Sequence, residues 1–97
     1  AYISEQLHLN SVLIEPEEVV ALITSSIDQD QVKLQVEAEK FAKESGKKIA
    51  FIDGYRNGKM VEKLGIAELP AIIEMKKGTM ARSAKPASID DVKNFVA

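Results

Sequence analysis

The chain has 97 residues, 45% of them hydrophobic and 29% charged, which is the composition of one ordinary globular domain with a modest core. Its 13 basic and 15 acidic side chains give a net charge of −2, which offers no positive field to nucleic acid or to an anionic membrane. It contains no cysteine, so disulfides, thiol redox chemistry and thiolate metal sites are excluded. We therefore predict a single domain over residues 1–97.

The chain also lacks the signals of membrane insertion and export. No apolar run approaches the roughly 20 residues that cross a bilayer. The first residues do not have a basic segment followed by an apolar one, as a signal peptide does. We expect a cytoplasmic protein.

Two strands are predicted in the first quarter of the chain. Residues 7–14 alternate loosely between polar and apolar and then become apolar, which indicates a short, partly exposed strand. Residues 19–24 are a continuous run of β-branched and aliphatic side chains. Such a run is typical of a strand buried on both faces of a parallel sheet, so we predict that it is central.

A helix and a second parallel strand follow. Residues 25–30 are rich in capping residues, and apolar side chains then recur at helical spacing until Ser45-Gly46 ends the pattern: Leu34, Ala38, Phe41 and Ala42. Residues 48–53 form another short apolar run, which predicts a strand parallel to the first in a βαβ crossover.

The second half predicts two more helices and a hairpin. After a polar turn at 54–58, Met60, Val61 and Leu64 indicate a short helix that Gly65 stops. Residues 71–75 and 80–83 predict antiparallel strands joined by the turn at 76–79. Ser88 and Asp91 form a weak capping box before a last amphipathic helix, which carries apolar residues at Ile89, Val92, Phe95 and Val96. The predicted fold class is α/β, with a mixed four- to five-stranded sheet and about three helices.

This order of elements, together with one block of sequence, resembles the thioredoxins. The block is Leu64-Gly65-Ile66, then Leu69-Pro70-Ala71-Ile72-Ile73, then Lys77-Gly78. It is similar to the thioredoxin pattern in which a Gly-Ile pair precedes a cis-proline, an aliphatic strand and a glycine hairpin. The resemblance is specific over residues 48–97, whereas residues 17–46 match in the order of elements only. It implies a thioredoxin-like fold and a cis bond between Leu69 and Pro70.

The departures from the thioredoxin pattern bear on function. Where a thioredoxin has two cysteines at the start of the first long helix, the nearest counterparts here are residues 27–30, which contain no sulfur. Ala71 stands where the family commonly has threonine, and residues 84–86 replace the glycine expected in the last strand. The resemblance therefore implies a redox-inactive member of the superfamily, without the CxxC motif.

The resemblance also implies where such a domain would bind. In thioredoxin-like domains the residue before the cis-proline has free backbone groups that can pair with an extended peptide, as in β-augmentation. The matching groove in this sequence is formed by nine residues: Ser26, Ile27, Asp28, Gln29, Asp30, Leu69, Pro70, Ala84 and Lys85.

Other candidates for chemistry have simpler explanations. His8 is the only histidine and has no partner for a metal site or a triad. Ser25 and Ser26 lack the surroundings of a nucleophilic serine, and helix capping by Ser26 or Asp28 is the simpler role for this turn. Asp28 and Asp30 are able to hold a divalent cation or act as acid and base, but the helix dipole alone also favours them there. Residues 53–58 begin like a calcium loop but fail at its third and twelfth positions, so we predict a turn.

The leading interpretation is a redox-inactive protein-binding domain, acting as an adaptor, chaperone or assembly factor. It implies no cofactor, no metal and no catalysis, and a protein or peptide as the partner rather than nucleic acid or a membrane. One alternative is a structural module that forms a homodimer or part of a larger assembly. The other is a metal-dependent enzyme that uses Asp28 and Asp30.

Overall fold

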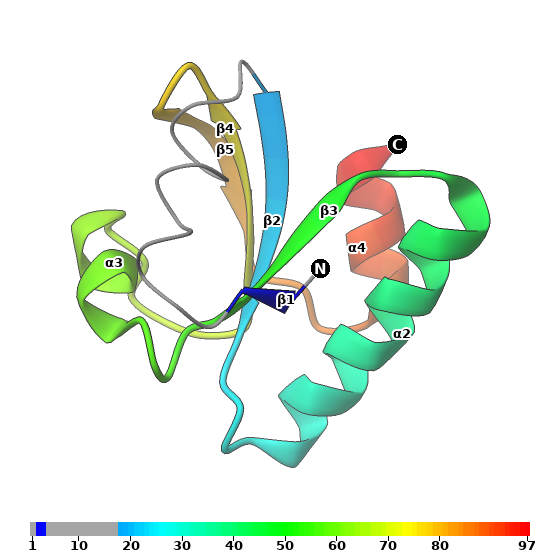
Figure 1. The fold of residues 1–97 in the computed structure, drawn as a ribbon, viewed down its shortest axis with the longest axis horizontal. Coiled ribbons are helices and arrows are strands. Elements are labelled where there is room, and N and C mark those ends of the chain that lie inside the picture. The colour runs from blue at the N-terminus through cyan, green and yellow to red at the C-terminus, as the bar shows by residue number, and fades with distance from the viewer. Residues whose placement is uncertain (1, 4–17) are drawn as a thin grey trace.

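A computed structural model describes residues 2–3 and 18–97 of the chain (Figure 1). The predicted strand at residues 7–14, with His8, lies outside the described residues. The described elements are, in chain order, β1 (Tyr2–Ile3), β2 (Glu18–Thr24), α2 (Gln29–Ser45), β3 (Ile49–Asp53), α3 (Gly58–Lys63), β4 (Ala71–Lys76), β5 (Thr79–Ala84) and α4 (Ile89–Val96). None of the helices in these residues is long and apolar enough to cross a membrane.

The strands form one mixed sheet in the order β1-β3-β2-β4-β5. Strand β2 is central, as its unbroken apolar run predicts, and it pairs in parallel with β3 and antiparallel with β4. The predicted hairpin of β4 and β5 is antiparallel and contains a register shift between Glu74 and Met75. Strand β1, which the sequence pattern did not predict, pairs in parallel with β3. The α/β fold class and the mixed sheet are confirmed.

The helices lie on both faces of the sheet and divide the core into two clusters. Helices α2 and α4 cover one face, and α3 covers the other (Figure 1). The cluster on the α2 and α4 face, called here the first core cluster, consists of Leu22, Leu34, Ala38, Ile49, Phe51, Ile72, Val92 and Phe95. The cluster on the α3 face consists of Ala21, Ile23, Ile52, Ile73 and Met75. Along β2, β3 and β4, side chains therefore point alternately into two separate aliphatic layers, one on each face of the sheet.

The two glycines that were predicted to stop helices have the left-handed conformation that this role requires. Gly46 follows α2 with φ 73°, and Gly65 follows α3 with φ 76°. A residue with a Cβ atom is strained at such a φ, whereas glycine is not. The ends of both helices are therefore set by local sequence.

The start of α4 differs from the predicted capping box. Ser88 is the N-cap residue, but its hydroxyl makes no capping hydrogen bond. The Asp91 carboxylate instead accepts a hydrogen bond of 2.8 Å from the backbone N–H of Ala87, one residue earlier than predicted. A carboxylate in the first turn still satisfies a backbone donor at the helix start and interacts favourably with the helix dipole.

Arg82 on β5 ties the hairpin to α4. Its guanidinium donates to Glu74 on the neighbouring strand, with Nε 3.1 Å from Oε1, and to the backbone carbonyl of Phe95 at 2.9 Å. It also lies over the Phe95 ring, 4.3 Å from the ring centroid. One side chain thus joins β4, β5 and α4.

The pairing of Glu74 with Arg82 predicts a dependence of stability on pH. The hydrogen bond from Arg82 and its positive charge lower the pKa of the Glu74 carboxyl below its ordinary value of 4.5. A carboxyl whose pKa is lower in the folded state stabilises the fold above pH 4.5, and that contribution is lost as the pH falls through the lowered pKa. Urea unfolding at several pH values measures this effect. We expect the free energy of unfolding of wild type to exceed that of Glu74→Gln at neutral pH, and the difference between the two proteins to disappear in acid. Glu37→Gln, an exposed change on α2, is the control and should show no such gap.

Candidate functional site

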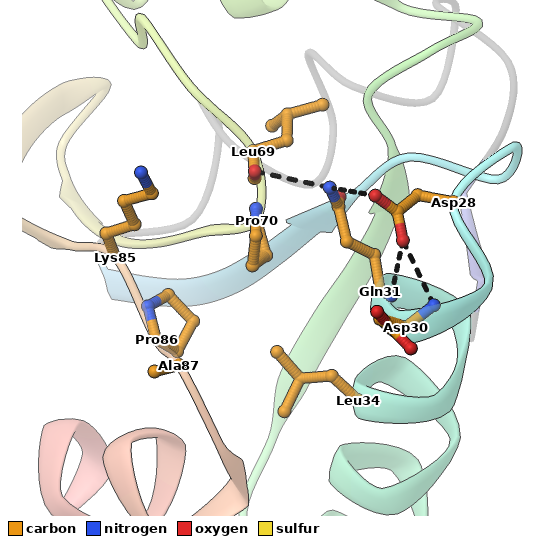
Figure 2. Close-up of a pocket in the computed structure, with 9 residues that line it drawn as sticks. All are labelled: Asp28, Asp30, Gln31, Leu34, Leu69, Pro70, Lys85, Pro86 and Ala87. Atoms are coloured by element: carbon orange, nitrogen blue, oxygen red, sulfur yellow. Dashed lines mark hydrogen bonds between the residues drawn. The ribbon is translucent and has the colours of Figure 1, made fainter.

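A groove opens where the first turns of α2 face the Leu69-Pro70 turn and the segment after β5 (Figure 2). Its volume is about 390 Å³. Nine residues line it: Asp28, Asp30, Gln31, Leu34, Leu69, Pro70, Lys85, Pro86 and Ala87. Three segments far apart in the sequence thus meet in one place, with apolar side chains in the groove and charged ones at its rim.

Asp28 begins α2 as its N-cap residue and has extended backbone geometry. Its Oδ1 accepts hydrogen bonds from the backbone N–H groups of Asp30 at 3.0 Å and Gln31 at 3.3 Å. These are two of the donors that a helix start leaves without partners inside the helix. The capping role that the sequence offered for Asp28 is confirmed.

Gln31 links the helix start to the far side of the groove. Its Nε2 donates to the carbonyl of Leu69 at 3.2 Å and to Asp28 Oδ2 at 3.3 Å (Figure 2). Its Oε1 accepts a hydrogen bond of 2.7 Å from the Ser25 backbone N–H. The expectation that both backbone groups of Leu69 are free is therefore wrong for the carbonyl.

The Leu69–Pro70 peptide bond is cis. The Leu69 side chain packs closely over Gly54, such that a Cβ atom added to this glycine would lie 2.5 Å from Leu69 Cδ1 and 2.9 Å from Ile23 Cγ2. Both distances are shorter than real Cβ contacts, so a side chain at residue 54 would fit only if the Leu69 and Ile23 side chains moved. The position of the turn before Pro70 thus depends on a glycine directly after β3.

Asp53 organises the loops at this edge of the sheet. Its side chain is 2% exposed, and its Oδ1 accepts hydrogen bonds from the backbone N–H groups of Ser26 at 3.3 Å, Tyr55 at 3.0 Å and Arg56 at 3.5 Å. Its other oxygen, Oδ2, lies 3.7 Å from Arg56 Nε. The carboxylate thus closes the turn that the sequence predicted and holds the loop in front of α2.

Five of the nine predicted groove residues line the groove: Asp28, Asp30, Leu69, Pro70 and Lys85. The other four, Ser26, Ile27, Gln29 and Ala84, do not. The first three lie in the loop before α2 or at its first position, whereas Ala84 ends β5 and lines a hollow on the other face of the sheet. Ile27, for example, is 70% exposed. The groove also includes Gln31, Leu34, Pro86 and Ala87, which were not predicted. The sequence held a signal for two of these four residues. Leu34 has helical spacing, and Pro86 is the proline that follows the last strand.

The acidic residues at the helix start do not form a recognisable metal centre. Within residues 2–3 and 18–97, no group of three or more His, Cys, Asp or Glu side chains is close enough to hold a metal ion. Both oxygens of Asp28 already accept hydrogen bonds from protein donors. The arrangement is suited to fixing the helix and shaping a surface.

The capping geometry predicts the effect of removing the Asp28 carboxylate. We expect Asp28→Ala to reduce the free energy of unfolding by about 0.5–2 kcal/mol, since the N–H groups of Asp30 and Gln31 lose their acceptor. Denaturant unfolding measures this, and Asp28→Asn, which keeps an acceptor oxygen, should recover most of it. Equal losses in the two variants would contradict the capping role.

The fold is shared with solved thioredoxin structures. The chain matches a thioredoxin from Plasmodium falciparum with a TM-score of 0.83 and 17% identity, covering 98% of this chain and 94% of the other. A thioredoxin from Malassezia sympodialis matches with a TM-score of 0.80 and 16% identity, covering 98% of this chain and 85% of the other. A thioredoxin from Trypanosoma brucei brucei matches with a TM-score of 0.79 and 21% identity, covering 99% of this chain and 86% of the other. No family model matches the sequence, and no curated protein does. The chain is a thioredoxin-like domain by fold, and it contains no cysteine.

Proposed function

We propose that this chain is a redox-inactive thioredoxin-like domain that binds an extended segment of another protein in the groove between α2 and the Leu69-Pro70 turn, and that it is not an enzyme. The observation that carries the proposal is the groove itself, which persists in a domain without thiols. Such a site is able to hold a peptide but unable to form a mixed disulfide with it.

The chemistry of the groove supports a peptide ligand. Leu34, Pro70 and Pro86 present apolar surface beside carboxylates at one rim and Lys85 at the other (Figure 2). Binding sites commonly combine an apolar floor with a few polar groups that fix the orientation of the ligand. The volume of about 390 Å³ suits one or two side chains of an extended segment.

One backbone group of Leu69 supports strand-like pairing with that segment. The Leu69 carbonyl is taken by Gln31, but the Leu69 N–H makes no hydrogen bond to the described residues. An extended peptide is able to offer a carbonyl to this donor. We therefore expect a ligand held by side-chain burial and a single backbone contact, rather than by a full ladder of hydrogen bonds.

The proposal requires that the protein lack disulfide reductase activity. We expect no turnover in an insulin-reduction assay with the purified protein, because the attacking group in such reactions is a thiolate and the chain has none. We also expect the same melting temperature with and without reductant. Measurable reduction by the pure protein would contradict the proposal.

Blocking the groove tests the binding site directly. Peptides are first selected on the full chain from a random display library, and their affinities are then measured for wild type, Ala87→Arg and Ala97→Arg. Ala87 is exposed and lines the groove, whereas Ala97 is exposed at the end of α4, outside it. We expect Ala87→Arg to bind at least about tenfold more weakly because a long charged side chain fills the groove, with Ala97→Arg unchanged.

Two results would overturn the assignment. One is a library that yields no peptide bound by the full chain. The other is a set of selected peptides that bind Ala87→Arg as tightly as wild type, which would place the interaction elsewhere on the domain.

A further inference from the structure

Strand β5 lies at one edge of the sheet that the described strands form. Among the described strands it pairs only with β4, and all of its residues except the half-buried Met80 are exposed. An edge strand presents a row of backbone N–H and C=O groups without partners in the sheet, on which another extended chain is able to pair.

Within residues 18–97, the usual protection of such an edge is weak. Proteins commonly guard edge strands with outward-pointing charges, prolines, bulges or a covering segment. The one charged side chain of β5, Arg82, lies over Phe95 and pairs with Glu74 on β4, so it does not point outward from the edge. The remaining exposed residues are small or uncharged: Thr79, Ala81, Ser83 and Ala84. The register shift is confined to the middle of the strand, and residues 82–84 pair regularly with β4.

A second hollow adjoins this strand on the α3 side of the sheet. Its volume is about 330 Å³, and it is lined by Met80, Ser83 and Ala84 of β5, by Ala71 of β4, and by the segment that follows α3. The apolar members of that segment are Leu64, Ile66 and Ala67. Strand addition gains specificity when a hollow beside the edge accepts alternate side chains of the incoming strand.

The charge around β5 selects the chemistry of the incoming strand. Residues 76–88 carry four basic side chains and no acidic one, although the whole chain has a net charge of −2: Lys76, Lys77, Arg82 and Lys85. Three of these cations pair with carboxylates: Arg82 with the half-buried Glu74 at 3.1 Å, and Lys76 and Lys85 with the exposed Glu18, at 3.5 Å, and Glu68. Exposed pairs of this kind contribute little energy and exchange readily with a new anion.

From these observations we propose that β5 is a second docking edge, separate from the groove, which adds one extended acidic segment of a partner protein as a further strand. An apolar side chain of that segment lies in the hollow beside Met80 and Ala84, and its carboxylates face the basic residues that flank the strand. A second copy of this chain fits the edge less well, because its own β5 brings the same cations to the contact.

The test uses two short peptides with blocked termini, one of alternating valine and glutamate and the other with lysine in place of each glutamate. Each is titrated into the isotope-labelled full chain and followed by amide chemical shifts. We expect the acidic peptide to shift the amides of β5 and of residues 64–68, and to bind about tenfold more tightly than the basic one. An acidic peptide with its central valine replaced by proline should bind more weakly than the parent, since it lacks one donor for the new ladder.

Two double variants distinguish an effect of charge at the β5 edge from an effect of the net charge of the whole chain. Thr79→Glu/Ser83→Glu lowers the net charge by two at the edge, and Lys33→Gln/Lys40→Gln lowers it by two on the exposed side of α2. We expect only the first variant to lose affinity for the acidic peptide. Ala87→Arg, which blocks the groove, should leave this binding intact, so the edge and the groove are tested independently.

The proposal is overturned by any of four results. They are the absence of shifts on β5, shifts confined to residues 28–34 and 85–87 of the groove, equal affinity for the acidic and basic peptides, and equal loss of binding in the two charge variants. Dimerisation through β5 in sedimentation experiments, in place of peptide binding, would also reject it in favour of a second copy.

Discussion

Replacing Phe51 with alanine is expected to lower the free energy of unfolding by about 3–5 kcal/mol, a large fraction of the roughly 5–15 kcal/mol that stabilises a typical domain. Phe51 lies on β3 in the first core cluster and is 3% exposed. The substitution removes a ring from the layer between the sheet and helices α2 and α4, and the packed neighbours are able to fill the resulting cavity only in part.

Chemical denaturation followed by circular dichroism measures this loss. Tyr55→Ala is the matched control, because this aromatic side chain is 60% exposed in the loop after β3. We expect the control to change stability by no more than about 0.5 kcal/mol. Similar losses in the two variants would show that the first core cluster is not the main source of stability.

The second large effect is expected at Asp53. Asp53→Ala removes the acceptor of three backbone N–H groups, those of Ser26, Tyr55 and Arg56. A buried donor left without a partner costs about 1–3 kcal/mol, and some of these donors will reach water after the loops relax, so we expect a total loss of about 2–4 kcal/mol.

Asp53→Asn distinguishes the hydrogen bonds from the shape of the side chain. Asparagine keeps one acceptor oxygen in the same place, so this variant should lose less stability than Asp53→Ala in the same denaturation experiment. Peptide binding in the groove should also weaken more in Asp53→Ala, because the loop before α2 loses its attachment to the end of β3. Equal stability of wild type and Asp53→Ala would contradict the organising role of this carboxylate.

Much of the fold could be predicted because its signals are local. The unbroken apolar run of β2, the helical spacing within α2 and the glycines at positions 46 and 65 each fix an element through neighbours in sequence. Strand β1 was missed because two residues are too short for any periodicity to appear. The cap of α4 differs from the predicted capping box because the Asp91 carboxylate accepts from the N–H of Ala87 rather than from that of Ser88, and residue types alone do not distinguish two adjacent backbone donors.

The groove was predicted less completely because its members meet only through long-range contacts. Gln31 and Leu69 are 38 positions apart, and nothing near Gln31 in the sequence indicates that its amide reaches a carbonyl across the groove. Of the predicted stretch at residues 26–30, only Asp28 and Asp30 line the groove. A helix that begins at Gln29 also directs the later residues Gln31 and Leu34 toward the opposite wall. Local patterns identify helix ends well, but they do not determine which face of the first turn meets a distant loop.

The close packing of Leu69 on Gly54 has a consequence for how this sequence is able to diverge. The space that a Cβ atom at position 54 would need is filled by the Leu69 and Ile23 side chains. A relative that has alanine or a larger residue at position 54 is accommodated most simply by a smaller residue at position 69, which loosens the contact that holds the turn before Pro70. The two positions should therefore covary in size among descendants of this chain, and each compensated pair would change how firmly that turn is held.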